Sequence, residues 1–212
     1  MIRTNTGAFK KIRVIRVQEF SDMTITPFLL ETERLLLRRF TDDDLETFLT
    51  YRNDPEVARW QGWSVPYPRE RAVEFIHKMK SRDPNEPGDW FQAAIVIKDT
   101  GEFIGDCAFF IKKDETNTAH MGYTIVQKHW RKGYAVEAAR RLMAYLFDER
   151  NLRRLIADTD VENTASWKTL EKLGLRREAH FVENILFKGR VASEYHYAML
   201  DREWKALNAQ NG

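Results

Sequence analysis

The sequence predicts an α/β fold of the α+β kind, in which a mixed sheet of about seven strands is flanked by about four helices. Apolar extended segments occur both before and after two amphipathic helical segments, a pattern typical of helices packed on one sheet. A short turn at 98–101 joins two apolar segments as a hairpin. Segment 119–126 leads into a helical pattern through a basic turn that contains Gly133. These features indicate one sheet with a ligand site where neighbouring strands diverge.

The composition describes an ordinary soluble globular protein and excludes several other classes. Of the 212 residues, 43% are hydrophobic and 31% are charged, and the formal charge of +2 gives no case for bulk nucleic-acid binding. No window reaches the roughly 18 to 20 apolar residues that a membrane span needs. The single cysteine, Cys107, excludes an internal disulfide and a multi-thiolate metal site, which fits a reducing, cytoplasmic compartment. Its place in an apolar run favours a buried small residue over a nucleophile.

The chain is expected to divide into a basic N-terminal extension at 1–28, a folded domain at 29–205 and a C-terminal tail at 206–212. Segment 12–17 alternates as a strand does, so the extension is either an added edge strand or partner contact, or a solvated tail. A nucleic-acid tether is a further alternative, which predicts strongly salt-dependent binding.

Periodicity and chain breakers predict the elements of the domain. Segment 31–40 is expected to be the first core strand, and Thr41 followed by three aspartates is a good helix start. That helix should end near 53–55, before a loop at 58–68 that is rich in Trp, Tyr and Pro. The remaining elements are a helix at 69–81, strands at 90–97, 102–112 and 119–126, a helix that includes Ala135 to Leu146, a strand at 153–158, a helix at 163–173 closed by Gly174, and strands at 175–183 and 191–200.

The basic turn after strand 119–126 suits an anion, above all a phosphate or pyrophosphate. A helix N-terminus presents unpaired backbone N–H groups and the positive end of the helix dipole. Gly133 lets the backbone approach such a ligand closely, while Arg131 and Lys132 add positive charge beside it. The alternative is a plain strand-to-helix connection with two solvated cations.

This turn resembles the acetyl-CoA loop of the GNAT N-acetyltransferases, Gln/Arg-x-x-Gly-x-Gly/Ala. The segment reads Trp130-Arg-Lys-Gly-Tyr-Ala135, so Gly133 and Ala135 match the pattern. Trp130 replaces the usual Gln or Arg, a form that looks like the RimJ/RimL-type branch of the family.

Two further segments carry the same resemblance, which covers roughly residues 31 to 204. RimJ/RimL-type enzymes open with Thr-x-Arg-Leu-x-Leu-Arg and Asn-Asp-Pro-Glu-Val, which stand here at 32–38 and 53–57. The segment from Asn163 to Leu175 resembles the family helix Asn-x-x-Ala/Ser-x-x-x-Tyr/Leu-x-Lys-x-Gly-Phe.

The resemblance implies a GNAT-like, mostly antiparallel sheet whose splayed central strands hold acetyl-CoA, with no metal. The pyrophosphate is expected on the amides of 131–136, and the strand backbone at 123–125 is expected to pair with pantetheine. On its own, Asn163 is equally a helix N-cap. The expected cofactor-binding residues are Tyr123, Thr124, Ile125, Arg131, Lys132, Gly133, Tyr134, Ala135, Val136, Asn163 and Ser166.

Two residues are candidates for proton transfer. Many GNAT members place at the position of Leu170 a Tyr that protonates the departing CoA thiolate; because it is missing here, Ser166, which has this role in RimJ/RimL-type enzymes, is the candidate acid. A hydroxyl that bonds back to the helix carbonyl one turn earlier is its alternative. His120 stands where the family often has a Glu and is a candidate base or substrate contact, or a structural histidine. Glu102 and Glu183 are weaker candidates.

The implied activity is transfer of acetyl from acetyl-CoA to a primary amine, a protein N-terminus or a small molecule, by direct attack in a ternary complex. Trp60, Trp63 and Tyr67 are expected to shape the acceptor pocket and favour a partly apolar or cationic amine, with packing over a loop as the competing explanation. The family also implies a homodimer. The rival function is a non-catalytic acyl-CoA-binding or regulatory domain, suggested by the missing Tyr and by His120.

Overall fold

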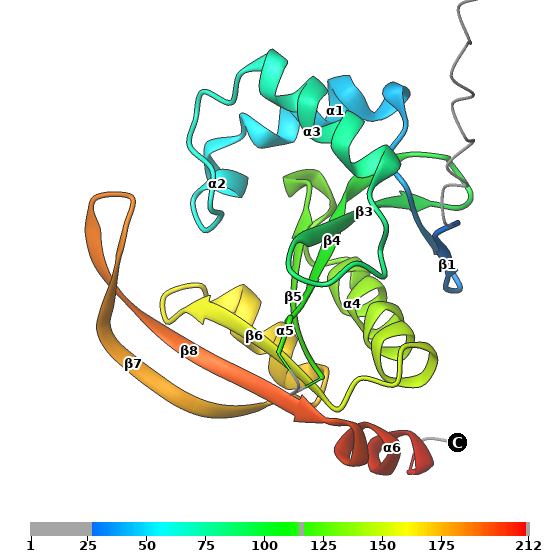
Figure 1. Cartoon of the computed structure of the whole chain (residues 1–212). Coiled ribbons are helices and arrows are strands. Elements are labelled where there is room, and N and C mark those ends of the chain that lie inside the picture. Colours follow the sequence, from blue (N-terminus) through cyan, green and yellow to red (C-terminus); the bar gives the residue numbers. More distant parts are fainter. Residues whose placement is uncertain (1–26, 115–116, 211–212) are drawn as a thin grey trace, which may run out of the picture.

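The computed structural model describes residues 27–114 and 117–210, and the expected strand at 12–17 lies outside them. The described residues form one eight-stranded sheet in the order β1-β2-β3-β4-β5-β6-β8-β7, together with six α-helices (Figure 1). The strands are β1 (Leu29–Glu31), β2 (Leu35–Arg38), β3 (Trp90–Ile97), β4 (Phe103–Ile111), β5 (Thr118–Ile125), β6 (Arg154–Asp160), β7 (Arg176–Phe187) and β8 (Arg190–Leu200). The helices are α1 (Leu45–Arg52), α2 (Pro55–Ala58), α3 (Arg69–Ser81), α4 (Tyr134–Ala144), α5 (Thr164–Lys172) and α6 (Asp201–Ala209).

The predicted mixed, mostly antiparallel sheet is confirmed, because every strand pair is antiparallel except β5 with β6. Segment 31–40, expected as one strand, instead contains the last residue of β1, a turn and β2, because the N–H of Thr32 donates to the carbonyl of Leu35 at 3.0 Å and the two strands pair as a hairpin. The short helix α2 and the C-terminal helix α6 were not expected. Helix α6 runs across residue 205, the expected boundary between domain and tail. Among the described residues, no helix is long and apolar enough to cross a membrane.

The sheet has a different set of helices on each face. Alternate residues of a strand point to opposite faces, and β4 shows this clearly. Cys107 and Phe109 belong to the larger core, which α4 and α5 cover. Asp106, between them, points to the other face and accepts a hydrogen bond from the hydroxyl of Tyr51 on α1. Arg52 adds an ion pair to the same buried carboxylate at 3.5 Å, which ties the group of helices α1 to α3 to the sheet.

Strands β5 and β6 separate soon after they meet. They pair in parallel only over 118–120 and 154–156. Beyond His120, β5 continues to pair with β4, and beyond Ile156, β6 continues to pair with β8, so the two strands run apart (Figure 1). Between the described strands, the facing edges of 121–125 and 157–160 therefore have no ladder partner. An edge of this kind presents N–H and C=O groups that another extended chain can pair with.

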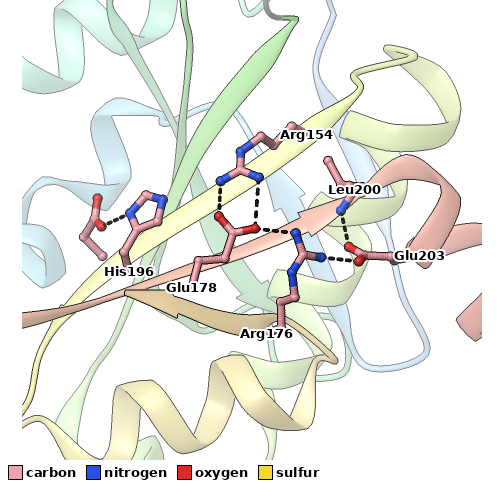
Figure 2. A network of polar contacts seen from close by, with 7 residues as sticks. Arg154, Arg176, Glu178, His196, Leu200 and Glu203 are labelled. Atoms are coloured by element: carbon pink, nitrogen blue, oxygen red, sulfur yellow. Dashed lines mark hydrogen bonds and ion pairs between the residues drawn. The ribbon is translucent and has the colours of Figure 1, made fainter. Parts of the chain in front are cut away.

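A chain of ion pairs fixes the end of the sheet against α6 (Figure 2). Both terminal nitrogens of Arg154 on β6 donate hydrogen bonds to the carboxylate of Glu178 on β7. Glu178 also forms an ion pair with Arg176. Arg176 in turn pairs with Glu203, whose other oxygen accepts the N–H of Leu200 at 2.7 Å. The hydrogen bonds from Arg154, followed by those from Arg176, lower the pKa of Glu178 to about 2. The network thus stays charged over the neutral range and caps the start of α6.

Candidate active site

The basic turn has the geometry of an anion cradle. Helix α4 begins at Tyr134, and the first helical hydrogen bond of the turn runs from the N–H of Glu137 to the carbonyl of Gly133 at 3.1 Å. The amides of 134–136 therefore have no carbonyl four residues earlier within the helix. Gly133 has a φ of 83° and Arg131 a φ of 62°, and the side chains of Arg131 and Lys132 are exposed. The turn can place several amides and two cations around one anion.

Arg34, which precedes Glu137 by 103 residues in the sequence, holds this turn in place. Its Nε donates to Glu137 Oε2 at 2.7 Å, and its Nη1 donates to the carbonyl of Lys132 at 3.2 Å. Its guanidinium carbon lies 4.6 Å from the centre of the Tyr134 ring. Thr32 adds a 2.6 Å hydrogen bond to Glu137. Sequence reasoning gave Arg34 no role at the site, although it belongs to the Thr-x-Arg-Leu segment that carried the resemblance.

A second set of contacts fixes the start of the turn. The indole nitrogen of Trp130 donates to the carbonyl of Ile125 at 2.6 Å, which folds the turn back onto the end of β5. Glu102 pairs with Lys128 and lies 3.1 Å from His129 Nε2. The hydrogen bond from Lys128, with that from His129, lowers the pKa of Glu102. Glu102 thus supports the turn as a carboxylate and is poorly suited to serve as a general base near neutrality.

The predicted cofactor residues of β5 line the edge where the strands separate. Thr124 and Ile125 are buried, and the carbonyl of Ile125 is already engaged by Trp130. Tyr123 points to the face of α5, where its hydroxyl donates to the carbonyl of Ser166 at 3.3 Å. Burial raises the pKa of Tyr123 against the opposing effect of hydrogen bonds with Ser166 and Thr169, so the phenol keeps its proton.

Helix α5 brings its predicted residues to the same place. Asn163 is its N-cap and accepts the N–H of Ser166 at 3.2 Å. Ser166 is partly buried beside Tyr123, whereas Leu170 is fully packed in the core. The hydroxyl of Thr169 donates to the carbonyl of Ala165 at 2.8 Å, which is the kind of backbone hydrogen bond considered as the alternative role of Ser166. The structure therefore brings a serine and a tyrosine together on one side of the gap.

His120 lies on the opposite face of β5, at the point where the strands part. Its Nδ1 lies 3.6 Å from Asp158 Oδ2, and His196 Nδ1 lies 2.5 Å from the other oxygen of the same carboxylate (Figure 2 shows His196). Burial lowers the pKa of His120 although Asp158 acts in the opposite direction. The ring of Trp90 meets His120 edge-on at 6.4 Å. Sequence reasoning missed Asp158 and His196 because both lie far from His120 in the sequence. Only the pairing of β5 with β6, and of β6 with β8, brings them close to it.

The three aromatic candidates of the 58–68 loop do not share one environment. Trp63 is 8% exposed, stacks under Arg52 at 3.6 Å and donates its indole N–H to the carbonyl of Arg52 at 2.9 Å. Tyr67 is 5% exposed and packs in the same aromatic core. Only Trp60 lines a hollow, which has a volume of about 600 Å³ and is bounded by the loop and the tip of the β7–β8 hairpin.

The remaining candidates lie away from the gap. Glu183 is exposed on β7 with a φ of 48°, and its N–H donates to Ser193 Oγ at 2.8 Å. Cys107 is buried, and burial raises the pKa of its thiol well above the usual range. Within the described residues, no group of three or more His, Cys, Asp or Glu side chains could hold a metal ion.

Comparison with known proteins places this geometry in a family. Residues 34–176 match the acetyltransferase (GNAT) domain. The uncharacterized N-acetyltransferase p20 of Bacillus licheniformis is 33% identical over 175 residues, which cover 82% of this chain and 97% of that protein. The crystal structure of a GNAT-family acetyltransferase from Bacillus anthracis is 29% identical, has a TM-score of 0.72 and is matched over 82% of this chain and 99% of its own.

More distant structures share the fold alone. A spermidine N-acetyltransferase from Vibrio cholerae, in complex with CoA and spermine, is 20% identical with a TM-score of 0.71, over 82% of this chain and 99% of its own. A ribosomal-protein-S5-alanine acetyltransferase from Vibrio fischeri is 20% identical with a TM-score of 0.67, over 84% and 98%. From the matched domain, the p20 relative and the sheet that opens beside the cradle at Gly133, the chain belongs to the GNAT family of acetyltransferases.

Proposed function

We propose that this protein transfers acetyl from acetyl-CoA to a primary amine by direct attack in a ternary complex. The observation that carries the proposal is the position of the amide cradle at the end of β5, directly beside the unpaired edge of 121–125. The space beside Gly133 is open to a ligand, because an added Cβ on Gly133 would meet only the Nη2 of Arg34 within 4 Å. The amides of a pantetheine arm fit the free strand edge in the same way as an added strand.

Each part of the chain then has one task in cofactor binding. The amides of 131–136 and the cations Arg131 and Lys132 hold the diphosphate, while 123–125 aligns the arm. Bound acetyl-CoA supplies a thioester whose carbonyl carbon is the electrophile. Asn163 is the N-cap of α5 and stabilises the start of that helix. We propose that it contributes to cofactor binding from this position.

His120 is the proposed base. An amine attacks only as the free base, so a proton must leave its nitrogen. Asp158 faces Nδ1, which favours the tautomer with a proton there and leaves Nε2 as the acceptor. Because burial lowers its pKa, His120 is uncharged at neutral pH and able to take the proton. Asp158 then lies near the imidazolium that results.

Ser166 is the proposed acid, on the other side of the gap. The departing thiolate needs a proton when the thioester C–S bond breaks, and the partly buried Ser166 hydroxyl on α5 is the proposed donor. The phenol of Tyr123, which contacts the Ser166 carbonyl, remains protonated and is positioned to assist. Acid and base candidates thus lie on opposite faces of β5.

Direct attack needs no covalent enzyme intermediate. Cys107 is buried among the residues under α4, and its raised pKa keeps the thiol protonated. Cys107→Ala is therefore expected to retain at least about half of the wild-type kcat, since the removed sulfur leaves only a small cavity. Burst release of one CoA per enzyme without an amine, abolished by Cys107→Ala, would contradict direct attack.

The test is turnover with the full chain, acetyl-CoA and a panel of primary amines that includes peptides with free N-termini. Free-thiol release and the mass of the acetylated amine are measured together. The rival function, a non-catalytic acyl-CoA-binding domain, predicts calorimetric binding of CoA without thiol release from any amine. Acetylation of one amine class, lost in His120→Gln with CoA affinity retained, supports the enzyme.

The Trp130 form of the loop and the fold shared with a ribosomal-protein acetyltransferase support a place in the RimJ/RimL-type branch. We propose further that the protein acts in the cytoplasm and forms a homodimer, as the family resemblance implies, with 29–205 as the catalytic domain. Sedimentation of the purified chain tests the dimer.

A further inference from the structure

The hollow beside Trp60 has no role in the mechanism proposed above. It lies between α2 with the following loop and the tip of the β7–β8 hairpin, two segments that face each other in Figure 1. The amine of Lys188 closes one side by donating to the carbonyl of Ala58 at 2.6 Å. Because this contact joins residues 130 positions apart, the hollow is a product of the fold rather than of one loop.

The hollow opens at the same end of β6 as the gap. Arg190, at the hairpin tip, forms an ion pair with Asp160, the last residue of β6. Asp160 lies two residues beyond Asp158, which faces the candidate base. Because Asp158 and Asp160 are two positions apart on β6, they share one face of the strand, so the hollow and the candidate base lie on the same side of the sheet.

The lining is cationic. Among the described residues that line the hollow are Arg59, Lys188 and Arg190, and none of the lining residues is acidic. Arg190 is partly neutralised by Asp160 and by Glu162, which lies 3.7 Å from its Nη1. Arg59 is exposed, has no ion pair within the described part of the chain, and stacks on Trp60 with its guanidinium carbon 4.6 Å from the ring centre. Its fork of donors is therefore available to a ligand beside a flat apolar wall.

We infer that the acceptor is an amine that carries a carboxylate, bound by Arg59 where its guanidinium stacks on Trp60. This inference rests on the proposed function and names the substrate class of the same site. Guanidinium groups recognise carboxylates through paired hydrogen bonds, and the nearby Lys188 and Arg190 add attraction. A polyamine would instead bring its second ammonium group to a wall that holds three cations. This inference differs from the partly apolar or cationic acceptor expected from the sequence in giving the acceptor a negative charge.

The test uses pairs of amines that differ only in a carboxylate or a carboxamide: aromatic amino acids with their amides, and dipeptides with acidic or amidated second residues. Spermidine is the cationic comparison. We expect the carboxylate member of at least one pair to have a kcat/KM about tenfold higher, the gain typical of one charge-assisted hydrogen bond. Arg59→Gln should remove this preference by raising the KM of the carboxylate member towards that of the amide member.

Arg71→Gln is the matched control, because Arg71 also stacks on an aromatic ring of the same helical group, 5.1 Å from the centre of Tyr67, but does not line the hollow. It should keep the preference. Equal kcat/KM within every pair, a preference for spermidine, or a preference that survives Arg59→Gln would overturn the inference while leaving acetyl transfer intact.

A binding readout separates this inference from the proposed function. The N-acetylated amino acid and its amide are titrated against the protein with CoA present, and indole fluorescence is followed. Tighter binding of the carboxylate that is lost in Arg59→Gln supports the inference even if no amine of the panel is acetylated. Equal binding of the two ligands refutes it, and failure of turnover alone counts only against the enzyme.

Discussion

Gly133 provides the sharpest test of the cradle, because its effects on folding and on cofactor binding can be separated. Its φ of 83° lies in the left-handed region, where an L-residue costs roughly 1–2 kcal/mol. An added Cβ would meet only Arg34 Nη2, at 3.4 Å, the flexible end of a side chain. Gly133→Ala and Gly133→Asp should therefore fold and lose about 1–2 kcal/mol of unfolding free energy.

The loss of cofactor affinity should be larger than this backbone cost and should depend on charge. A hydrogen bond from an amide to a charged oxygen contributes roughly 1.5–3 kcal/mol, so displacing one such contact in Gly133→Ala weakens CoA binding about tenfold or more. A carboxylate placed about 4 Å from the diphosphate adds a repulsion of about 1 kcal/mol in water and about 4 kcal/mol at a protein surface. Gly133→Asp should thus bind CoA at least about a further fivefold more weakly than the alanine variant.

Calorimetric titration with CoA and urea unfolding measure the two quantities. Gly189→Ala is the control, since Gly189 has a φ of 82° in the turn between β7 and β8, and no atom lies within 4 Å of the position of its Cβ. It should lose similar stability and keep full CoA affinity. The cradle assignment fails if Gly133→Asp binds CoA as tightly as the control.

Three further predictions follow from the site and the sheet. Ser166→Ala should lower kcat roughly 100-fold with little change in CoA affinity, whereas an unchanged rate, with Tyr123→Phe slow instead, would move the acid role to the tyrosine. Asp158→Asn removes the carboxylate that raises the pKa of His120, so the acid limb of the kcat/KM profile should move to lower pH; a limb that stays in place would exclude His120 as the base. Glu178→Gln should cost about 1 kcal/mol at pH 7, after allowance for its partial exposure. Because the pKa of Glu178 is lowered from 4.5 to about 2, the cost should persist above about pH 5 and vanish as pH falls towards 2, which urea unfolding at several pH values would detect.

Much of the fold followed from local pattern. The hairpin of β3 and β4 and the helix after Gly133 were expected from apolar periodicity, because each buries one face or both faces of a short segment. The errors occurred where local signals were weak. Segment 31–40 divides at a turn that Thr32 stabilises, and α6 is a short helix held by Glu203 and by the packing of Trp204.

Some residues of the candidate site could likewise be assigned from local sequence, and others could not. Loop residues such as Gly133 could be assigned from sequence because an anion cradle is built from consecutive amides at one helix start. The aromatic loop could not, since periodicity does not distinguish a Trp that packs under Arg52 from one that lines a hollow. Sequence proximity grouped Trp60 with Trp63, and packing separated them.

By itself the sequence determined the family, the strand that runs into the anion-binding turn, and the helix that carries Ser166, because neighbouring residues of one segment encode all three. Only the tertiary structure decided that Arg34 braces a carboxylate 103 residues away, that Asp158 and His196 stand beside His120, and that three cations line the hollow beside Trp60. Those contacts depend on the order and register of strands, which bring together side chains from distant segments and leave no periodic trace along the chain.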